Sequence, residues 1–227
     1  MLQKDDFLDK APISLAPERD LTTNKVLHNT YMLLSLTLLF SALTAGFAMA
    51  TNAQPLHWLI TIGGYFGLLF VVTRLRNSAW GLAAVFALTG FLGYTLGPIL
   101  NFYLSMRGGS QVVMTALGGT GAIFMALSAY AVVSRKDFSF MGGFLMVGIL
   151  VAFLASLGAM LFGIPMLSLA VSGMFILLMS GMILWQTSEI IHGGETNYIM
   201  ATVSLYITIF NLFISLLQIL GIFSGDD

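Results

Sequence analysis

Seven long apolar segments are the feature that most limits how this chain of 227 residues can fold. An α-helix needs roughly 20 predominantly apolar residues to cross the hydrocarbon of a bilayer. The segments have about this length and cover residues 26–50, 56–73, 79–103, 112–134, 138–162, 166–191 and 198–223. The sequence therefore predicts an all-α integral membrane protein, folded as a bundle of seven transmembrane helices.

The composition supports a chain whose main partner is membrane lipid. Only 8% of the residues are charged, against about 25% in a typical soluble domain, so the chain cannot cover a large water-facing surface. The net charge of −1 gives no reason to expect nucleic acid as a partner. The chain has no cysteine, which excludes disulfides, thiolate zinc sites and cysteine nucleophiles.

The domain organisation follows from the same segments. Residues Met1–Lys25 are polar and lack the apolar core and cleavage site of a secretory signal, so we expect a flexible cytoplasmic tail. Residues 26–223 form a single membrane domain, because the connections between its apolar segments are too short for another domain. A short C-terminal tail, 224–227, follows.

The distribution of Lys and Arg predicts the orientation in the membrane. Eight of the nine fall on one side of the predicted bundle, namely Lys4, Lys10, Arg19, Lys25, Arg74, Arg76, Arg135 and Lys136, and only Arg107 falls on the other. Positively charged residues favour the cytoplasmic side. This places the N-terminus in the cytoplasm and, with seven spans, the C-terminus on the opposite side of the membrane.

Polar residues recur at regular intervals in the last apolar segment. The stripe consists of Ser204, Thr208, Asn211, Ser215 and Gln218, at spacings of 4, 3, 4 and 3 residues. Such a stripe lies on one face of a helix, and polar groups facing lipid would cost free energy. We therefore expect the last helix to lie centrally, with its stripe toward other helices or water.

A second polar face is predicted in the sixth segment, where Gln186 and Glu189 follow Ser168 and Ser172 at helical spacing. Gly193 and Gly194 end this helix, and Thr196 or Asn197 can cap the next one, which gives a tight hairpin. A polar zone of Gln186, Glu189, Thr208 and Asn211 follows from this hairpin. It is either a sensor or path for a proton or cation, or a set of hydrogen bonds that fixes the bundle.

The residues indicate neither an enzyme nor a cofactor or metal site. His28 and His57 lie at helix edges, and Asp137 lies in a loop, so no nucleophile with a base and no pair of carboxylates lies within a span. Glu189, His192 and Glu195 surround the expected hairpin and supply too few ligands for a metal.

Small residues four apart could allow close helix contacts. The pairs are Gly63 and Gly67, Gly93 and Gly97, and Gly118 and Ala122. They serve either packing within the bundle or oligomerisation, so the oligomeric state stays open.

Four stretches resemble one known family. GFLGYTLGPIL (Gly90–Leu100) and ALGGTGAIF (Ala116–Phe124) resemble the signature of the Bax inhibitor-1 family. KVLHNTYMLLSLTLLFSALTA (Lys25–Ala45) and HGGETNYIMATVSLYITIFNLFISLLQILG (His192–Gly221) resemble its bacterial branch. The resemblance implies a Gram-negative inner membrane protein in which six helices surround the last one.

The resemblance also implies a function. Members of the bacterial branch bind FtsH, a membrane-anchored ATP-dependent protease, and restrain its degradation of membrane proteins. For a protease that grips exposed termini, Met1–Lys25 would be the natural handle. The alternative is a calcium or proton leak, because other members are pH-sensitive calcium leaks with two membrane aspartates. Those positions correspond to Gln186 and Thr208 here, and these neutral residues cannot share a proton as two carboxylates can, which favours the regulator.

Overall fold

The computed structural model describes the backbone of residues 16–224 and the side chains of residues 23–224. All regular structure in this part is helical: α1 (Ala16–Ala50), α2 (Trp58–Leu75), α3 (Trp80–Leu104), α4 (Gly109–Ser134), η1 (Ser139–Met141, a 3₁₀ turn), α5 (Gly142–Phe162), α6 (Pro165–His192) and α7 (Tyr198–Ser224). Seven of these helices are long and apolar enough to cross a membrane. The prediction of an all-α membrane protein with seven spans is confirmed.

The first helix differs most from the expected segments. It begins at Ala16 rather than near residue 26, so Ala16–Lys25 is helical although it was expected to belong to the tail. The rest of the expected tail, residues 1–15, and residues 225–227 at the other end lie outside the described residues.

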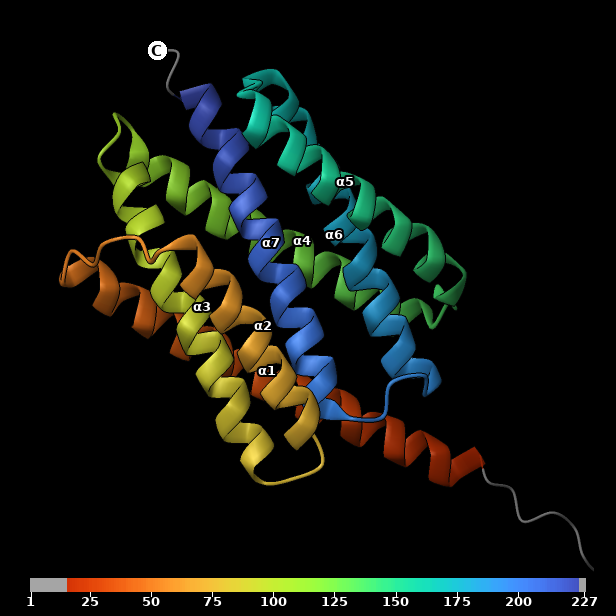
Figure 1. The fold of residues 1–227 in the computed structure, drawn as a ribbon. Helices are drawn as coiled ribbons and strands as arrows, with labels where there is room; N and C mark the ends of the chain where they lie inside the picture. Colours follow the sequence, from red (N-terminus) through yellow and green to blue (C-terminus); the bar gives the residue numbers. More distant parts are fainter. Residues whose placement is uncertain (1–15, 225–227) are drawn as a thin grey trace, which may run out of the picture.

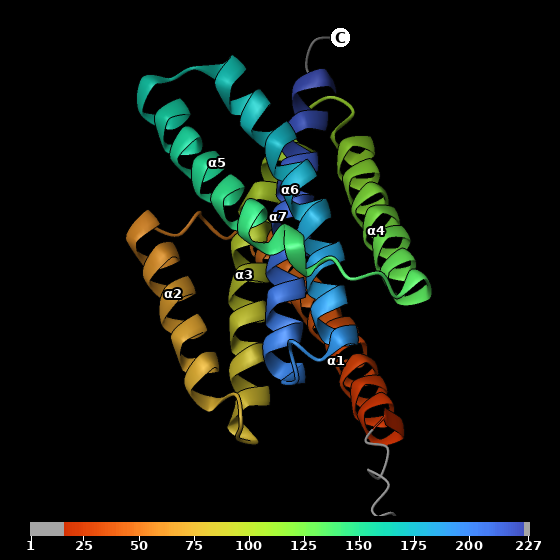
Figure 2. The ribbon, with the colours of Figure 1, turned by 90° about the vertical axis from the view of Figure 1, so that its right-hand side faces the viewer.

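The last helix lies among four others. α7 packs against α1, α3, α4 and α6, whereas α2 packs on α3 and α5 packs on α6. Figure 1 shows α7 running between α2 and α3 on one side and α5 and α6 on the other, and Figure 2 shows α2 and α5 toward the outside. Only 6% of the most apolar window of α2 is buried, against 50% for α7. Most of the surface of α2 is therefore available to lipid.

Glycines bring α1 and α3 close together. A Cβ atom at Gly93 would collide with the carbonyl and hydroxyl oxygens of Ser41, and one at Gly97 would collide with Ala48. Gly63, Gly67 and Gly118 instead face open space. Of these glycines, only Gly93 and Gly97 make close contacts between helices within the described chain.

The hairpin between α6 and α7 is tight and capped at both ends. Gly193 ends α6 with a positive φ of 78°, a conformation that glycine adopts without steric cost. The Asn197 side-chain oxygen accepts hydrogen bonds from the amides of Ile199 (3.0 Å) and Met200 (3.1 Å). Asn197, rather than Thr196, is thus the cap of α7. Its amide also donates to the carbonyl of Arg76 at 3.0 Å, which ties the hairpin to the loop between α2 and α3.

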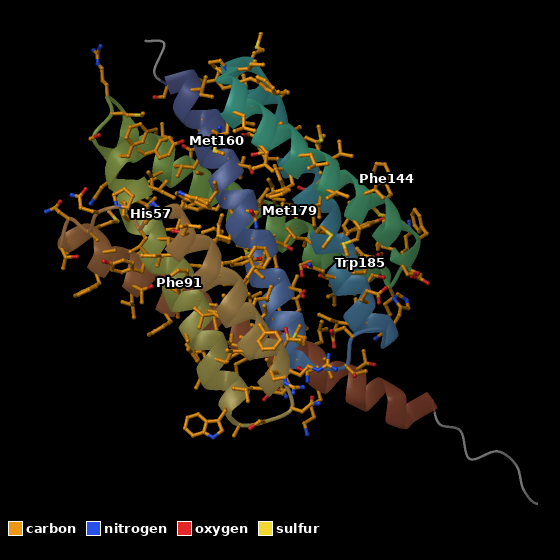
Figure 3. All side chains as sticks on the ribbon, viewed as in Figure 1. His57, Phe91, Phe144, Met160, Met179 and Trp185 are labelled. Carbon is orange, nitrogen blue, oxygen red and sulfur yellow. The ribbon has the colours of Figure 1, made fainter. Side chains whose placement is uncertain are left out.

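The exterior is apolar, as a lipid-facing surface requires. Large apolar side chains on α5 point away from the bundle, among them Phe144, which is 73% exposed and lies on the outer side of the helix in Figure 3.

Candidate functional site

The polar faces of α6 and α7 meet directly inside the bundle. Thr208 donates its hydroxyl to the side-chain carbonyl of Gln186 at 3.1 Å, and also lies 3.0 Å from the carbonyl oxygen of Ser204. Gln186 and Thr208 are 8% and 2% exposed. The side-chain nitrogen of Gln186 makes no hydrogen bond to any residue that the structure describes. This pair therefore holds two neutral groups in contact inside the bundle.

A second contact joins the same helices farther from the hairpin. Ser172 donates to the side-chain carbonyl of Gln218 at 2.8 Å, and the amide of Gln218 donates to the hydroxyl of Ser168 at 2.6 Å. Residues at similar distances from a hairpin face one another across it, which is why the two predicted stripes meet in register. Hydrogen bonds between transmembrane helices contribute about 0.6 kcal/mol each on average.

The remaining stripe residues lie next to these contacts. Asn211 donates to the carbonyl of Ile207 in its own helix at 2.8 Å, and its side chain lines a cavity together with Gln186 and Thr208. Ser204 lines the same cavity, and Ser215 is buried at 6% exposure. The stripe of α7 therefore contacts α6 and also lines the cavity that lies next to α5.

Four cavities follow this polar face. One of about 130 Å³ contains Glu189, and the next, about 650 Å³ between α2, α5, α6 and α7, shares Gln186 and Ser204 with it. A third of about 260 Å³ shares Asn211 with the second, and a fourth of about 430 Å³ shares Gln218 with the third. Met179 and Met160, labelled in Figure 3, line the second and the fourth. The cavities run along α6 and α7 toward both ends of these helices.

Glu189 lies at the hairpin end of this series. Its main-chain carbonyl accepts hydrogen bonds from the amides of Gly194 (2.8 Å) and Glu195 (3.2 Å). Its carboxylate lies so close to Gly194 that a Cβ there would collide with it. Glu189 therefore takes part in the C-terminal end of α6. It lies next to the rest of the polar zone, because it lines the same cavity as Gln186.

Glu189, His192 and Glu195, the acidic and histidine residues around the hairpin, make separate structural contacts. His192 lies 2.9 Å from the carbonyl of Ser188 and 3.2 Å from that of Arg135, which ties α6 to the loop after α4. The Glu195 carboxylate accepts from the amide of Asn197 at 2.7 Å. Among the described residues, no group of three or more His, Asp or Glu could hold a metal ion.

The loop after α4 contains an acidic residue, Asp137, whose pKa is lowered. The amide of Ser139 donates to the Asp137 carboxylate at 2.8 Å. This hydrogen bonding to Ser139 lowers the pKa of Asp137, with a smaller contribution from His192.

Sequence reasoning missed a second polar contact of α7, on the face opposite the stripe. The Tyr206 hydroxyl lies 2.6 Å from the hydroxyl of Ser41 on α1 and donates to the carbonyl of Thr89 on α3 at 3.2 Å. A separate contact joins Tyr31 of α1 to Ser128 of α4. Tyrosines within spans, whose hydroxyls need partners when buried, were the signal that could have revealed both.

Seven spanning helices with paired, neutral polar groups between the last two define a polytopic α-helical membrane protein. The sequence pattern of the family described as "Inhibitor of apoptosis-promoting Bax1" matches residues 23–225. The chain belongs to this family, the Bax inhibitor-1 family, as its motifs predicted.

Three relatives show how far the similarity extends. The chain is 54% identical to an uncharacterized protein of Pseudomonas aeruginosa, over 89% of this chain and 91% of that one. It is 52% identical to "Modulator of FtsH protease YccA" of Escherichia coli K12, over 91% and 94% of the two chains. An uncharacterized membrane protein of Vibrio cholerae is 48% identical over 92% and 95%.

Proposed function

We propose that this protein is an inner-membrane regulator that binds the FtsH protease and restrains its degradation of membrane proteins. The observation that carries the proposal is the 52% identity to the Escherichia coli modulator of FtsH protease, which extends over 91% of this chain. The similarity covers the helices and the loops together, so any surface that such a modulator presents to a protease has a counterpart here.

The chemistry of the described residues supports a role in binding rather than catalysis. The polar groups between α6 and α7 are amides and hydroxyls that bond to one another, as in the Gln186–Thr208 pair. Acyl transfer within the membrane requires a nucleophile activated by a base. His192 contacts the hydroxyl of Ser188 at 3.2 Å as well as two main-chain carbonyls. This contact lies at the end of α6 beside the loop after α4, and the Ser188 hydroxyl also accepts a hydrogen bond from the amide of Phe138 at 3.0 Å, so the pair has a structural role.

The proposed orientation has the N-terminus in the cytoplasm and the C-terminus in the periplasm. The contacts of Asn197 with Arg76 and of His192 with Arg135 bring three loops to one end of the bundle. Arg74, Arg76, Arg135 and Lys136 therefore share that end, whereas Arg107 lies in the loop between α3 and α4. The positive-inside rule favours the cytoplasm for the cationic end. A relative from Escherichia coli O6:H1, 52% identical over 91% of this chain, is named "Inner membrane protein YccA".

The segment Met1–Lys25 is the proposed contact for the proteolytic machinery, since proteases engage exposed termini. Deletion of residues 1–15 leaves the described helices intact and should slow turnover of the protein by FtsH. Unchanged turnover would reject this role for the segment. Binding to FtsH through the membrane helices would be unaffected by either result.

A second candidate function is a calcium or proton leak, and the series of cavities along α6 and α7 favours it. Glu189 and Glu195 are acidic residues that line this series, and Glu189 is the one that lies on α6. If the protein conducts cations, Glu189→Gln should reduce flux into liposomes that contain the purified protein. The absence of flux with the parent protein would remove this candidate.

The test of the regulatory function is association with FtsH in the membrane. The protein with a C-terminal affinity tag is purified from membranes solubilised in mild detergent, with another tagged seven-span protein at equal expression as the control. Selective recovery of FtsH supports the proposal. Equal recovery of FtsH with both proteins contradicts it.

A further inference from the structure

A separate cavity lies on the face of α7 opposite the polar stripe. It has a volume of about 370 Å³ and is enclosed by α1, α3, α4 and α7. Its α7 wall consists of Tyr206, Ile209, Phe210 and Phe213, and at 3.6 residues per turn these positions point away from Thr208 and Asn211. The cavity is therefore distinct from the cavities along α6.

The cavity exists because α1 and α4 meet at only one end. Tyr31 of α1 bonds to Ser128 of α4, and its ring packs on Phe124 with the ring centres 6.0 Å apart. Beyond this contact, the cavity occupies the space between residues 38–49 of α1 and residues 117–124 of α4. α7 and the residues Leu96 and Leu100 of α3 complete its wall.

The wall offers little to hold water, because none of its hydroxyl protons is free for a further hydrogen bond. Three of its side chains carry hydroxyls, and all three are already bonded to protein atoms. Ser41 bonds to Tyr206 at 2.6 Å, Tyr206 donates to the Thr89 carbonyl at 3.2 Å, and Thr120 donates to the Ala116 carbonyl at 2.7 Å. A buried water needs two to four polar partners, and apolar cavities stay dry. The natural occupant is apolar.

The cavity is continuous with the lipid-facing surface. Ala42, Gly46 and Leu117 line it and are themselves exposed. Beside them, Leu43 and Phe47 are 72% and 64% exposed on the outside of α1. All of these residues lie within the spans Thr23–Ala50 and Gly109–Ser134. At this depth the surrounding medium is hydrocarbon, so acyl chains have direct access to the opening.

From these observations we infer that the cavity binds one acyl chain of a membrane phospholipid. The volume falls within the range of roughly 300–1,000 Å³ of small-molecule sites, which are mostly apolar. Neither Lys nor Arg lines the cavity, so nothing in it recognises the carboxylate of a free fatty acid, and the phospholipid headgroup stays outside with the other lipids. The site would be a specific lipid site of this fold, beyond any role in protease regulation.

The test uses two glycines on α4 as a matched pair. Gly121 lines the cavity and Gly118 does not, and a Cβ atom added at either position meets no atom within 4 Å. Gly121→Leu fills the cavity, whereas Gly118→Leu makes the same chemical change outside it. The full-length protein and both variants are placed in lipid nanodiscs that contain a phospholipid with a photoreactive diazirine in its acyl chain. After irradiation, the labelled residues are mapped by mass spectrometry.

In the parent protein, labelling of Ala42, Ala45 and Leu117 should exceed labelling of exposed residues on α5. Gly121→Leu should lower this labelling about tenfold, because the new side chain displaces the acyl chain from the cavity. A tenfold change corresponds to the loss of roughly ten close carbon–carbon contacts between the acyl chain and the cavity wall. Gly118→Leu should leave it unchanged.

Three outcomes would overturn the inference. The first is uniform labelling of all lipid-facing helices in the parent protein. This outcome can be observed without either variant. The second is equal labelling of the cavity in both variants. The third is cavity labelling by a diazirine fatty acid that exceeds labelling by the phospholipid at equal concentration, which would identify a free fatty acid as the occupant.

Discussion

The hydrogen bond between Tyr206 and Ser41 provides a quantitative test of how α7 is held in the bundle. Tyr206 is 1% exposed, and its hydroxyl joins α7 to Ser41 of α1 and to the main chain of α3 at Thr89. Tyr206→Phe removes this hydroxyl and leaves the Ser41 hydroxyl without that partner. A buried polar group left without a partner costs about 1–3 kcal/mol, so we expect the free energy of unfolding to fall by that amount.

The interaction itself is measured by a double-mutant cycle. Ser41→Ala alone should cost about 0.6 kcal/mol, the average for a hydrogen bond between transmembrane helices, because Tyr206 keeps its bond to Thr89. In the Tyr206→Phe background the same change should cost close to nothing. The coupling free energy should therefore be about 0.6 kcal/mol.

The assay is reversible unfolding of the purified protein in mixed micelles, with denaturing detergent as the variable and helix content as the signal. Tyr65→Phe is the control, because the Tyr65 hydroxyl makes no hydrogen bond to the described residues, and it should leave the unfolding midpoint in place. Effects of Tyr206→Phe and Ser41→Ala that add to within about 0.3 kcal/mol would refute the reasoning.

Other changes test separate parts of the structure. Thr30→Val removes a buried hydroxyl without a partner and should raise the free energy of unfolding by about 1 kcal/mol in the same titration. Asn197→Ala removes the cap of α7 and should lower it by about 1–2 kcal/mol. Since the pKa of Asp137 lies below its ordinary value of 3.8, its carboxylate stabilises the fold above that pH. Asp137→Asn should therefore destabilise the protein at pH 7, and the difference from the parent should vanish as the pH falls below the Asp137 pKa. Glu189→Gln should leave recovery of FtsH unchanged in the affinity purification.

The sequence was sufficient to predict the spans because hydropathy and length decide them in a bilayer. The segment expected at 198–223 corresponds to α7 at Tyr198–Ser224, and that expected at 166–191 corresponds to α6 at Pro165–His192. The start of α1 was missed, because residues Ala16–Lys25 are polar and hydropathy does not detect a helix that continues beyond the apolar segment.

The meeting of Gln186 with Thr208 could also be anticipated. Both residues lie on helices joined by a short hairpin, so their register follows from the number of residues between them and the turn. For contacts between distant segments, a tyrosine within a span indicates that a hydrogen-bond partner is needed but not which helix supplies it. Ser41 is 165 residues from Tyr206, and the cavity beside them forms only because α1 diverges from α4 beyond Tyr31. A periodic pattern within one helix carries no information on which other helix covers its opposite face.

Whether this protein restrains FtsH can be measured from the lifetime of an FtsH membrane substrate. The decay of that substrate is followed by pulse–chase in cells that lack the protein, in cells that express it, and in cells that express an unrelated seven-span protein at the same level. If the protein restrains FtsH, the substrate decays more slowly only when the protein is present, and its decay does not differ between strains when FtsH is inactive. Equal decay in all three strains with active FtsH would contradict this role.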